Sequence, residues 1–261
     1  EKMIQKTGIH HIALSGGVFM NVKANKKISE LDGVHDLFVM PSCGDESNAL
    51  GACWYGYKML ALKEKMLFKP RPLEDLYLGP EYDEEYVEEF IEKNHLKEKY
   101  IIKKIKNVSL EIAKLLAKGN IIARCSGKSE WGARALGNRS ILANPTHPDT
   151  IRILNETIKD RDFWMPFTPS MIDRFEKKYI LNPKKIFSPY MAITFDSTVL
   201  AQKQLPAAMH PYDFTIRPQI VTREHNKEYY ELISEFQKLT GIGAVLNTSF
   251  NLHGEPNVLT P

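Results

Sequence analysis

The sequence is organised around residues 129–140, which read SEWGARALGNRS and precede the apolar run 141–143. Two arginines, Arg134 and Arg139, lie five positions apart among glycines. Glycine allows the backbone to approach a ligand closely, and a guanidinium group can hold a phosphate or carboxylate through two parallel hydrogen bonds. We therefore interpret residues 129–140 as an anion-binding active-site loop.

Hydrophobic segments on both sides of this loop predict the strands that hold it. A helix over residues 108–118, which Gly119 is placed to cap, precedes a strand over residues 121–124. The order strand, loop, strand places Arg134 and Arg139 at strand ends, which is where α/β proteins build their sites.

The first part of the chain predicts two strand–turn–helix units, with strands over residues 9–14 and 37–40. The first strand ends at Gly16-Gly17. A glycine pair before a helix start either binds phosphate at the free N–H groups or makes only a tight turn. The second strand leads to Asp45, which either caps the following helix or binds a metal or phosphate.

A shift to Lys, Arg and Pro at residues 63–72 predicts a linker or domain boundary, because proline interrupts both helices and strands. Beyond it, apolar side chains follow helical and extended periods in turn. The predicted elements are a helix over 83–93, a helix containing Ile151, Leu154 and Ile158, a loop over 159–170, a strand over 191–195, a loop over 197–211, a strand over 215–221, a helix over 226–240 ending at Gly241, and a strand over 244–246.

Polar and basic residues gather in the loops of this second part. Asn247, Thr248, Ser249 and Asn251 follow the last predicted strand. Such neutral donors and acceptors suit an amide-like substrate or ribose and phosphate oxygens, although Asn and Ser also favour plain turns. Each basic residue alone fits a solvated surface charge, but together two or three of this set are expected to bind anions: Lys128, Arg134, Arg139, Lys159, Arg161 and Arg217.

Composition places the chain among globular proteins of one large or two ordinary domains. It has 261 residues, 43% of them hydrophobic and 26% charged, and a net charge of +3, so bulk charge does not demand a nucleic-acid partner. The three cysteines have no paired spacing, which favours a reducing cytoplasm over a disulfide framework. No apolar run approaches the ~18 residues of a membrane span, so we expect no membrane partner.

Metal and covalent chemistry receive little support from the motifs. His10 and His11 are adjacent on a predicted strand and therefore point to opposite faces. The sequence has no H-E-x-x-H, no paired cysteines, no G-x-S-x-G and no Walker loop. These observations leave phosphoryl, nucleotidyl or acyl-phosphate chemistry that works by positioning and charge stabilisation.

Six strings, in this order along the chain, resemble the carbamoyltransferase family that includes nodulation protein NodU and antibiotic O-carbamoyltransferases such as TobZ. They are LSGGVFMN at 14–21, GDESNALGA at 44–52, EWGARALGNRSIL at 130–142, PFTPS at 166–170, RPQ at 217–219 and LNTSFN at 246–251. The match covers essentially the whole chain, and the string at 130–142 is highly specific.

The resemblance implies an α/β (α+β) fold in two parts. Residues 1–68 would be the C-terminal remnant of an actin/hexokinase-like ATPase domain that transfers the carbamoyl group, and residues 69–261 a YrdC-like twisted-sheet domain. The YrdC-like domain would form carbamoyl adenylate from carbamoyl phosphate and ATP with Mg²⁺. The transferase domain would then pass the carbamoyl group to an acceptor hydroxyl, so the expected protein is a cytoplasmic O-carbamoyltransferase.

The resemblance also implies roles for individual residues. Lys128, Arg134 and Arg139 would hold phosphates as catalytic residues. Asp45 would be the last ligand of a divalent metal, Fe²⁺, in the complete transferase site, whose nucleotide pocket Gly16 and Gly17 would line. The further residues assigned to substrate or nucleotide binding are Asn21, Glu130, Asn138, Ser140, Lys159, Arg161, Arg217, Asn247, Ser249 and Asn251.

The chain departs from the family pattern in three places. The H-x-x-x-H metal pair of the family's N-terminal half does not occur here, Ala133 stands where the family has proline, and the C-terminus stops before the usual helix. Both ends look cut. We therefore expect a fragment that cannot complete carbamoyl transfer alone, although its adenylating half can act.

Two other functions stay open at this level. A YrdC-like fold also offers a basic concave face to RNA, so the chain would then be an RNA- or nucleotide-binding module without catalysis; its nearly neutral charge argues against this. In the other alternative, residues 1–68 serve only as a docking or dimerisation surface, and the expected assembly is a homodimer. A sugar, an aminoglycoside and a nodulation factor all fit as the acceptor.

Overall fold

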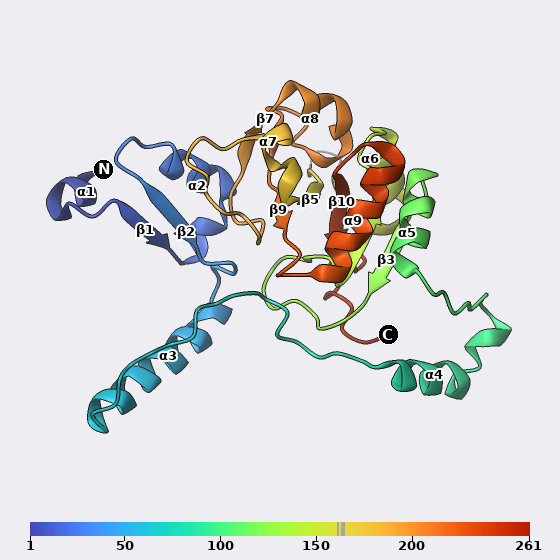
Figure 1. Ribbon diagram of the computed structural model, residues 1–261, viewed down its shortest axis with the longest axis horizontal. Coiled ribbons are helices and arrows are strands. Elements are labelled where there is room, and N and C mark those ends of the chain that lie inside the picture. The colour runs from blue at the N-terminus through green and yellow to red at the C-terminus, as the bar shows by residue number, and fades with distance from the viewer. Residues whose placement is uncertain (161, 163–164) are drawn as a thin grey trace.

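The computed structural model describes residues 1–160, 162 and 165–261. This part of the chain is a mixed α/β structure whose strands form three sheets (Figure 1). At this level the predicted α/β class is confirmed. None of the described helices combines the length and the hydrophobicity that a membrane span needs.

The N-terminal segment forms the smallest sheet. Its strands, β1 (His11–Leu14) and β2 (Asp36–Val39), pair in parallel with His11 opposite Asp36, and both predicted strands are confirmed. The other elements of the segment are α1 (Lys2–Thr7), the 3₁₀ helix η1 (Gly17–Met20), α2 (Val22–Ser29) and α3 (Glu46–Lys63).

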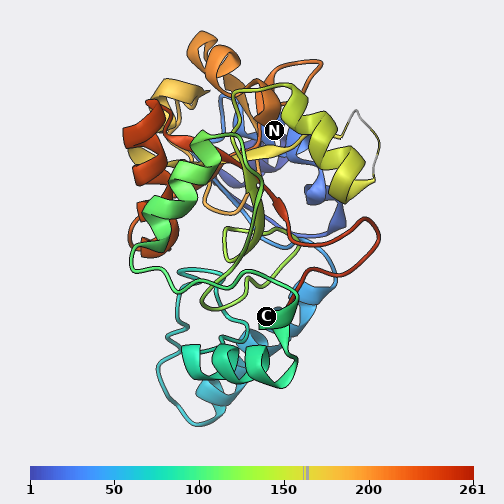
Figure 2. The same ribbon diagram turned by 90° about the vertical axis from the view of Figure 1, so that its right-hand side faces the viewer.

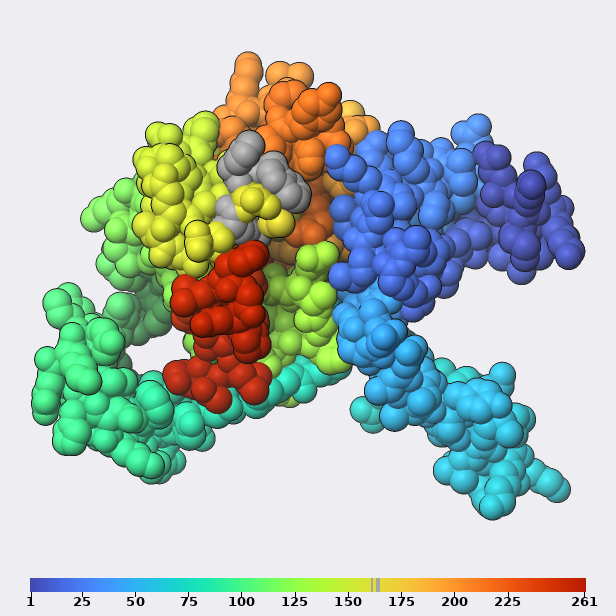
Figure 3. Space-filling view, turned by 180° about the vertical axis from the view of Figure 1, so that it is seen from behind, coloured from blue at the N-terminus to red at the C-terminus, as the bar shows by residue number. Residues whose placement is uncertain are grey.

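Helix α3 extends away from the body of the molecule (Figures 1 and 3). Only Ser47 and Ala61 of this helix are buried. Asp45 occupies the N-cap position of α3, but its side chain makes no capping hydrogen bond, so the predicted capping bond is absent. The backbone of Asp45 is itself helical, and a cap side chain usually reaches the helix amides from an extended backbone.

A long connection without helix or strand follows, over residues 66–83. It leads to α4 (Glu84–Lys93), which the side chain of Asp83 caps by accepting from Tyr86 N at 2.9 Å, and to the 3₁₀ helix η2 (Leu96–Glu98). The predicted helix over 83–93 is confirmed, and its acidic first turn complements the positive end of the helix dipole.

A five-stranded sheet holds the loop around which the sequence is organised. Its order is β3–β4–β10–β5–β9, and only β5 and β9 run parallel. The strands are β3 (Ile122–Cys125), β4 (Arg139–Ala143), β10 (Ala244–Ser249), β5 (Thr168–Ile172) and β9 (Gln219–Val221). Strand β10, the last in the chain, lies in the middle and pairs antiparallel with both β4 and β5.

Helices cover the two faces of this sheet. Successive side chains of β4 point to opposite faces of the sheet. Leu142 therefore joins the main core, while Ile141 and Ala143 join a second cluster with Leu154. Helices α5 (Val108–Ala117) and α9 (Lys227–Thr240) pack side by side on the main core (Figure 2). The second cluster lies under α6 (Asp149–Leu154), which continues as the π-helical turn η3 (Asn155–Lys159), and under the 3₁₀ helix η5 (Pro206–Ala208).

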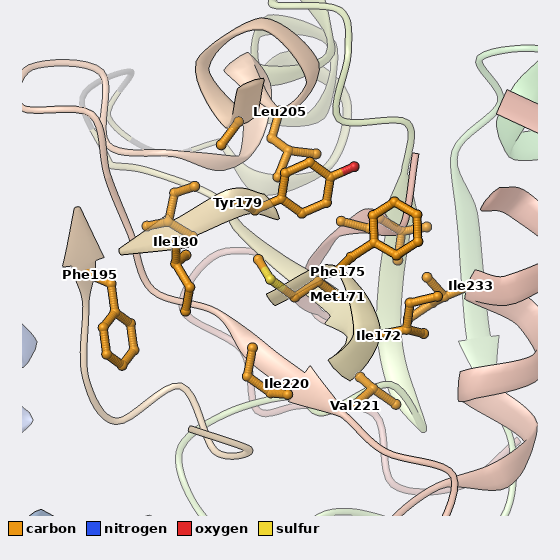
Figure 4. Packing of buried hydrophobic residues seen from close by; sticks show 14 of the residues in the cluster. Met171, Ile172, Phe175, Tyr179, Ile180, Phe195, Leu205, Ile220, Val221 and Ile233 are labelled. Atoms are coloured by element: carbon orange, nitrogen blue, oxygen red, sulfur yellow. The ribbon is translucent and has the colours of Figure 1, made fainter. Parts of the chain in front are cut away.

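The third sheet packs onto the same core. Its antiparallel strands are β6 (Ile180–Leu181), β7 (Phe195–Ser197) and β8 (Thr215–Ile216), with η4 (Asp173–Phe175), α7 (Glu176–Tyr179) and α8 (Val199–Gln204) beside them. Figure 4 shows Tyr179, Ile180 and Phe195 in one cluster with Met171 and Ile220 of the larger sheet. Side chains, rather than backbone pairing, therefore join the two sheets.

The predicted strand over 191–195 and the single predicted strand over 215–221 are wrong. Strand β7 begins only at Phe195, because Met191 has a φ of 57° and so leaves the extended region. The segment 215–221 divides into β8 and β9, which belong to different sheets. Pro218 lies between them, and proline has no N–H to continue a ladder.

Two predicted loops contain regular structure. Helix α8 occupies part of the predicted loop 197–211, and Thr198 caps it by accepting from Ala201 N at 3.1 Å. Strand β5 begins at Thr168, inside the predicted loop 159–170. Pro169 is tolerated in this interior strand because the β9 ladder starts only at Ser170, so the missing N–H interrupts no bond on that side.

The N-terminal segment packs onto the core of the rest of the chain. Val34, Leu37 and Val39 belong to the same buried cluster as the large sheet. Lys184 Nζ donates to Leu31 O at 2.6 Å and to Val34 O at 2.7 Å, and Asn25 Nδ2 donates to Ala192 O at 2.8 Å. The two predicted parts thus share one hydrophobic core, while the boundary at residue 68 stays a prediction.

Asp213 carries a charged contact across this interface. Its carboxylate forms an ion pair with Lys23 and accepts from Thr215 N at 3.1 Å and Thr215 Oγ1 at 2.8 Å. Burial alone raises the pKa of Asp213, but these bonds and the nearby His210 outweigh it and lower the pKa to about 2.

We expect Asp213→Asn to lower the free energy of unfolding by about 1 kcal/mol near neutral pH, since the pair is partly solvated. The folded-state pKa lies below the ordinary value of 3.8, so this contribution is present above about pH 4 and is lost as pH falls toward 2. Urea unfolding of both proteins across this range measures the difference. In a Lys23→Met background the effect of Asp213→Asn should shrink, and a pH-independent difference would contradict the assignment.

Candidate active site

A small polar cavity of about 90 Å³ lies where the loop 126–138 meets the ends of the interior strands β5 and β10. Five parts of the chain meet there: the loop itself, the start of β5 with the residues before it, Met191, the connection between β8 and β9, and the end of β10. Four predicted site residues line it, namely Arg134, Arg217, Asn247 and Ser249. The rest of the lining consists of Ala133, Ala135, Pro166, Phe167, Thr168, Met191 and Thr248.

Arg134 is the half-buried cation of this cavity. Within the described chain its guanidinium makes no hydrogen bond or ion pair, although it interacts electrostatically with Cys43. Burial lowers the pKa of Arg134, yet a guanidinium stays charged in proteins. A desolvated positive charge beside a cavity is suited to an anionic ligand.

Lys159 lies at the end of the π-helical turn η3, and the residue is only 3% exposed. Its Nζ donates to Ser249 O at 2.5 Å and Ser249 Oγ at 3.2 Å, and to Asn251 O at 3.0 Å and Asn251 Oδ1 at 2.7 Å. Short π-helical turns occur often at functional sites. The structure therefore brings three predicted residues into direct contact, while the predicted Arg161 lies outside the described residues.

Ser249 belongs to both groups, because it lines the cavity and contacts Lys159. Its hydroxyl also donates to Asn251 Oδ1 at 2.6 Å. The lysine cluster and the arginine cavity are thus adjacent parts of one site at the end of β10. We define this candidate active site as Arg134, Lys159, Arg217, Asn247, Ser249 and Asn251.

Three residues that the sequence assigned to ligand binding make hydrogen bonds within the loop, and their roles in binding stay predictions. Glu130 Oε1 accepts from three backbone amides, Leu136 N and Asn138 N at 2.7 Å each and Arg139 N at 3.2 Å. Asn138 Nδ2 donates to Lys128 O at 2.8 Å. Ser140 Oγ accepts from Gly137 N at 3.0 Å. These contacts support a structural role for Glu130, Asn138 and Ser140.

Arg139 is 1% exposed and does not line the cavity. All three guanidinium nitrogens donate to backbone carbonyl oxygens: Nε to Leu259 at 3.2 Å, Nη1 to Ser126, Gly127 and Asn138 at 3.0, 3.1 and 3.0 Å, and Nη2 to Pro80 at 3.3 Å. This geometry favours a structural role over phosphate binding. Lys128, the third predicted catalytic residue, has an exposed side chain outside the cavity lining.

The glycines of the loop approach protein atoms. Gly137 has a φ of +113°, and a Cβ there would lie 2.3 Å from the ring of Tyr229. Gly132 has a φ of +106°, and a Cβ there would lie 3.2 Å from Ser42 Cβ. Both positions therefore need glycine for backbone conformation and for packing.

The predicted residues of the N-terminal segment lie apart from this site. Gly16 and Gly17 are exposed, and Asn21 caps α2 by accepting from Lys23 N and Ala24 N at 3.1 Å each. Asp45 is exposed as well. Among the described residues no group of three His, Cys, Asp or Glu side chains is arranged to hold a metal ion. The residues present therefore do not form a metal site by themselves, and the roles of Gly16, Gly17 and Asp45 stay predictions.

The sequence analysis missed the polar groups behind Asn247. Asn247 Nδ2 donates to Ser170 Oγ at 2.9 Å, and Ser170 Oγ donates to Gln219 Oε1 at 2.6 Å. Gln219 Nε2 continues to Leu136 O at 2.8 Å, which ties the strands to the loop. Ser170 and Gln219 both lie in strings that match the family, and this was the available signal.

Arg134 and Arg139 should respond differently to substitution. We expect Arg134→Ala to change the free energy of unfolding by less than about 1 kcal/mol and to weaken pyrophosphate binding by about 10- to 100-fold, the worth of a charge-assisted hydrogen bond. Arg139→Lys should lower the free energy of unfolding by about 3 kcal/mol, because buried carbonyls lose their donors.

Urea unfolding and titration calorimetry with pyrophosphate measure the two effects. Arg152→Ala, on the exposed face of α6, is a suitable control because its ion pair with Glu156 lies on the surface. If Arg134→Ala destabilised the protein as much as Arg139→Lys and left pyrophosphate binding unchanged, the division of roles between the two arginines would be wrong.

Comparisons with known proteins agree with the motifs. The family "Carbamoyltransferase C-terminus" matches residues 113–261, and "Carbamoyltransferase N-terminus" matches residues 1–54. A solved structure of full-length HypF in its phosphate- and nucleotide-bound form superposes with a TM-score of 0.42 and 18% identity over 59% of this chain and 22% of HypF.

Relatives match over nearly the whole chain. An uncharacterized protein of Methanocaldococcus jannaschii is 42% identical over 98% of this chain and 41% of its own length. Nodulation protein NolNO of Sinorhizobium fredii is 34% identical over 97% of this chain and 36% of its own length. The chain thus spans less than half the length of these relatives. Because the C-terminal family alone matches more than half of its residues, the chain belongs to the carbamoyltransferase family.

Proposed function

We propose that this chain carries the carbamoyl-activating part of an ATP-dependent O-carbamoyltransferase. The observation that carries the proposal is the convergence of Arg134, Arg217, Asn247 and Ser249 on one cavity, with Lys159 against Ser249. Cations suit the phosphate of carbamoyl phosphate, and neutral amide and hydroxyl groups suit its carbamoyl end. Membership of the carbamoyltransferase family supports the same substrate class.

The proposed activation has two steps. Water cleaves the O–P bond of carbamoyl phosphate, which gives carbamate and inorganic phosphate. A carbamate oxygen then attacks the α-phosphorus of ATP, the bond to the β-phosphate breaks, and pyrophosphate leaves. Overall, carbamoyl phosphate, ATP and water give carbamoyl adenylate, phosphate and pyrophosphate.

The residues of the site would act mainly by positioning and charge stabilisation. Arg134 and Arg217 would bind phosphate oxygens and stabilise the charge that develops during transfer. Lys159 does not line the cavity, and its Nζ already contacts Ser249 and Asn251, so its proposed part is to position these two residues at the end of β10. Mg²⁺ would enter bound to ATP, and no step is assigned to a protein-held metal.

For a protein of the relatives' full length, we propose transfer of the carbamoyl group to an acceptor hydroxyl. The hydroxyl oxygen would attack the carbamoyl carbon, and AMP would leave. We propose a partial actin/hexokinase-like segment over residues 1–68, with Fe²⁺ near Asp45 in the complete site, and a YrdC-like domain over residues 69–261. A cytoplasmic location is proposed from the three free cysteines.

The test is pyrophosphate release by this chain with ATP, carbamoyl phosphate and Mg²⁺. We expect release that depends on carbamoyl phosphate and that falls by about 100-fold or more in Arg134→Ala, as when one donor to a transition-state oxyanion is removed. The surface variant Arg152→Ala should keep full activity.

Absence of carbamoyl phosphate-dependent pyrophosphate release by the folded chain would overturn the proposal. Salt-sensitive RNA binding that survives Arg134→Ala, together with no pyrophosphate release, would instead favour a binding module, because diffuse phosphate contacts do not depend on one guanidinium.

A further inference from the structure

Asn247 presents a buried hydrogen-bond acceptor at the candidate active site. The residue is 2% exposed and lines the polar cavity with Arg134 and Arg217. Its Oδ1 is buried and has no hydrogen-bond partner within the described chain. A buried acceptor without a donor costs about 1–3 kcal/mol, so such a group on a residue that lines a polar cavity favours a ligand that donates to it.

The orientation of the Asn247 amide follows from its partners. The other amide atom lies 3.0 Å from Ala135 O and 3.4 Å from Gln219 Oε1. Both partners are carbonyl oxygens, which can only accept, so the atom between them is the NH₂ group. Oδ1 is therefore the atom left without a partner.

The groups behind Asn247 prevent the amide from turning. Ser170 Oγ accepts from Asn247 Nδ2 at 2.9 Å and donates to Gln219 Oε1 at 2.6 Å. Gln219 is 3% exposed and donates in turn to Leu136 O at 2.8 Å. A flipped amide would place Oδ1 against carbonyl oxygens, which is repulsive. Asn247 is thus held as a fixed acceptor.

We infer that Asn247 Oδ1 accepts a hydrogen bond from the NH₂ group of the carbamoyl donor and thereby selects carbamoyl over other acyl groups. The inference rests on the proposed function. Carbamoyl phosphate combines an anion, which the arginines suit, with an N–H donor, which Oδ1 suits. Acetyl phosphate has the same anion and a similar shape, but its methyl group leaves Oδ1 unpaired.

The experiment compares carbamoyl phosphate with acetyl phosphate as donors for pyrophosphate release from ATP, as kcat/KM. We expect the wild-type protein to prefer carbamoyl phosphate by about 100-fold in kcat/KM. A preference of this size is consistent with the cost of leaving a buried acceptor unpaired when the analogue binds. In Asn247→Ala the use of carbamoyl phosphate should fall toward that of acetyl phosphate, so that the ratio approaches about 1.

Asn25 offers a matched control. It is also a fully buried asparagine whose Nδ2 donates to carbonyls, to Phe19 O at 2.7 Å and Ala192 O at 2.8 Å, and whose Oδ1 has no partner within the described chain, but it does not line the cavity. Asn25→Ala should lower stability while leaving the donor ratio unchanged. A loss of discrimination confined to Asn247→Ala therefore separates selection from general destabilisation.

The outcomes distinguish the inference from the proposed function. Pyrophosphate release by the wild-type protein with equal use of both donors overturns the inference and leaves the proposed function standing, and this result needs no variant to fold. A folded Asn247→Ala variant that still prefers carbamoyl phosphate over acetyl phosphate as strongly as the wild-type protein also overturns the inference and leaves the proposed function standing. If neither donor supports pyrophosphate release, both the proposed function and the inference are overturned.

Discussion

The buried guanidinium of Arg139 is the constraint on which the candidate site depends. Its donors need acceptors on every side because the group lies out of water, and the chain supplies them from Pro80, Ser126, Gly127, Asn138 and Leu259. The connection before α4, the loop after β3 and the C-terminal segment are thereby held together (Figure 3). Glu130 completes the loop from inside by accepting from three of its amides.

The loop held in this way meets the end of the central strand. Strand β10 enters the middle of the sheet between β4 and β5, so its end reaches both the loop and the π-helical turn of η3. Arg134 then lines the cavity while its neighbour Ala135 accepts from Asn247. The roles divide according to hydrogen bonding. Groups that find partners within the chain build the loop, whereas Arg134 and the Asn247 oxygen, which belong to cavity-lining residues, have no hydrogen-bond partner within the described chain.

The sequence allowed most helices and the strands beside the central loop to be predicted, because their periodicity and caps are local. Helix α9, for example, ends as predicted at Gly241, which adopts a left-handed conformation. Predictions failed where a local signal was overridden. Met191 adopts a left-handed backbone, Pro218 divides one predicted strand between two sheets, and the Pro-rich segment at Thr168 becomes an interior strand.

The sequence by itself determined the family, the α/β class and the set of polar residues from which the site is drawn, since residue types and their order carry that information. Which of these residues line the cavity was decided only by tertiary structure. Arg134 and Arg139 have the same chemistry and lie in the same loop, yet one lines the cavity and the other is enclosed by carbonyls. The acceptors of Arg139 come from segments up to 120 residues away in sequence, and no local pattern can indicate such partners.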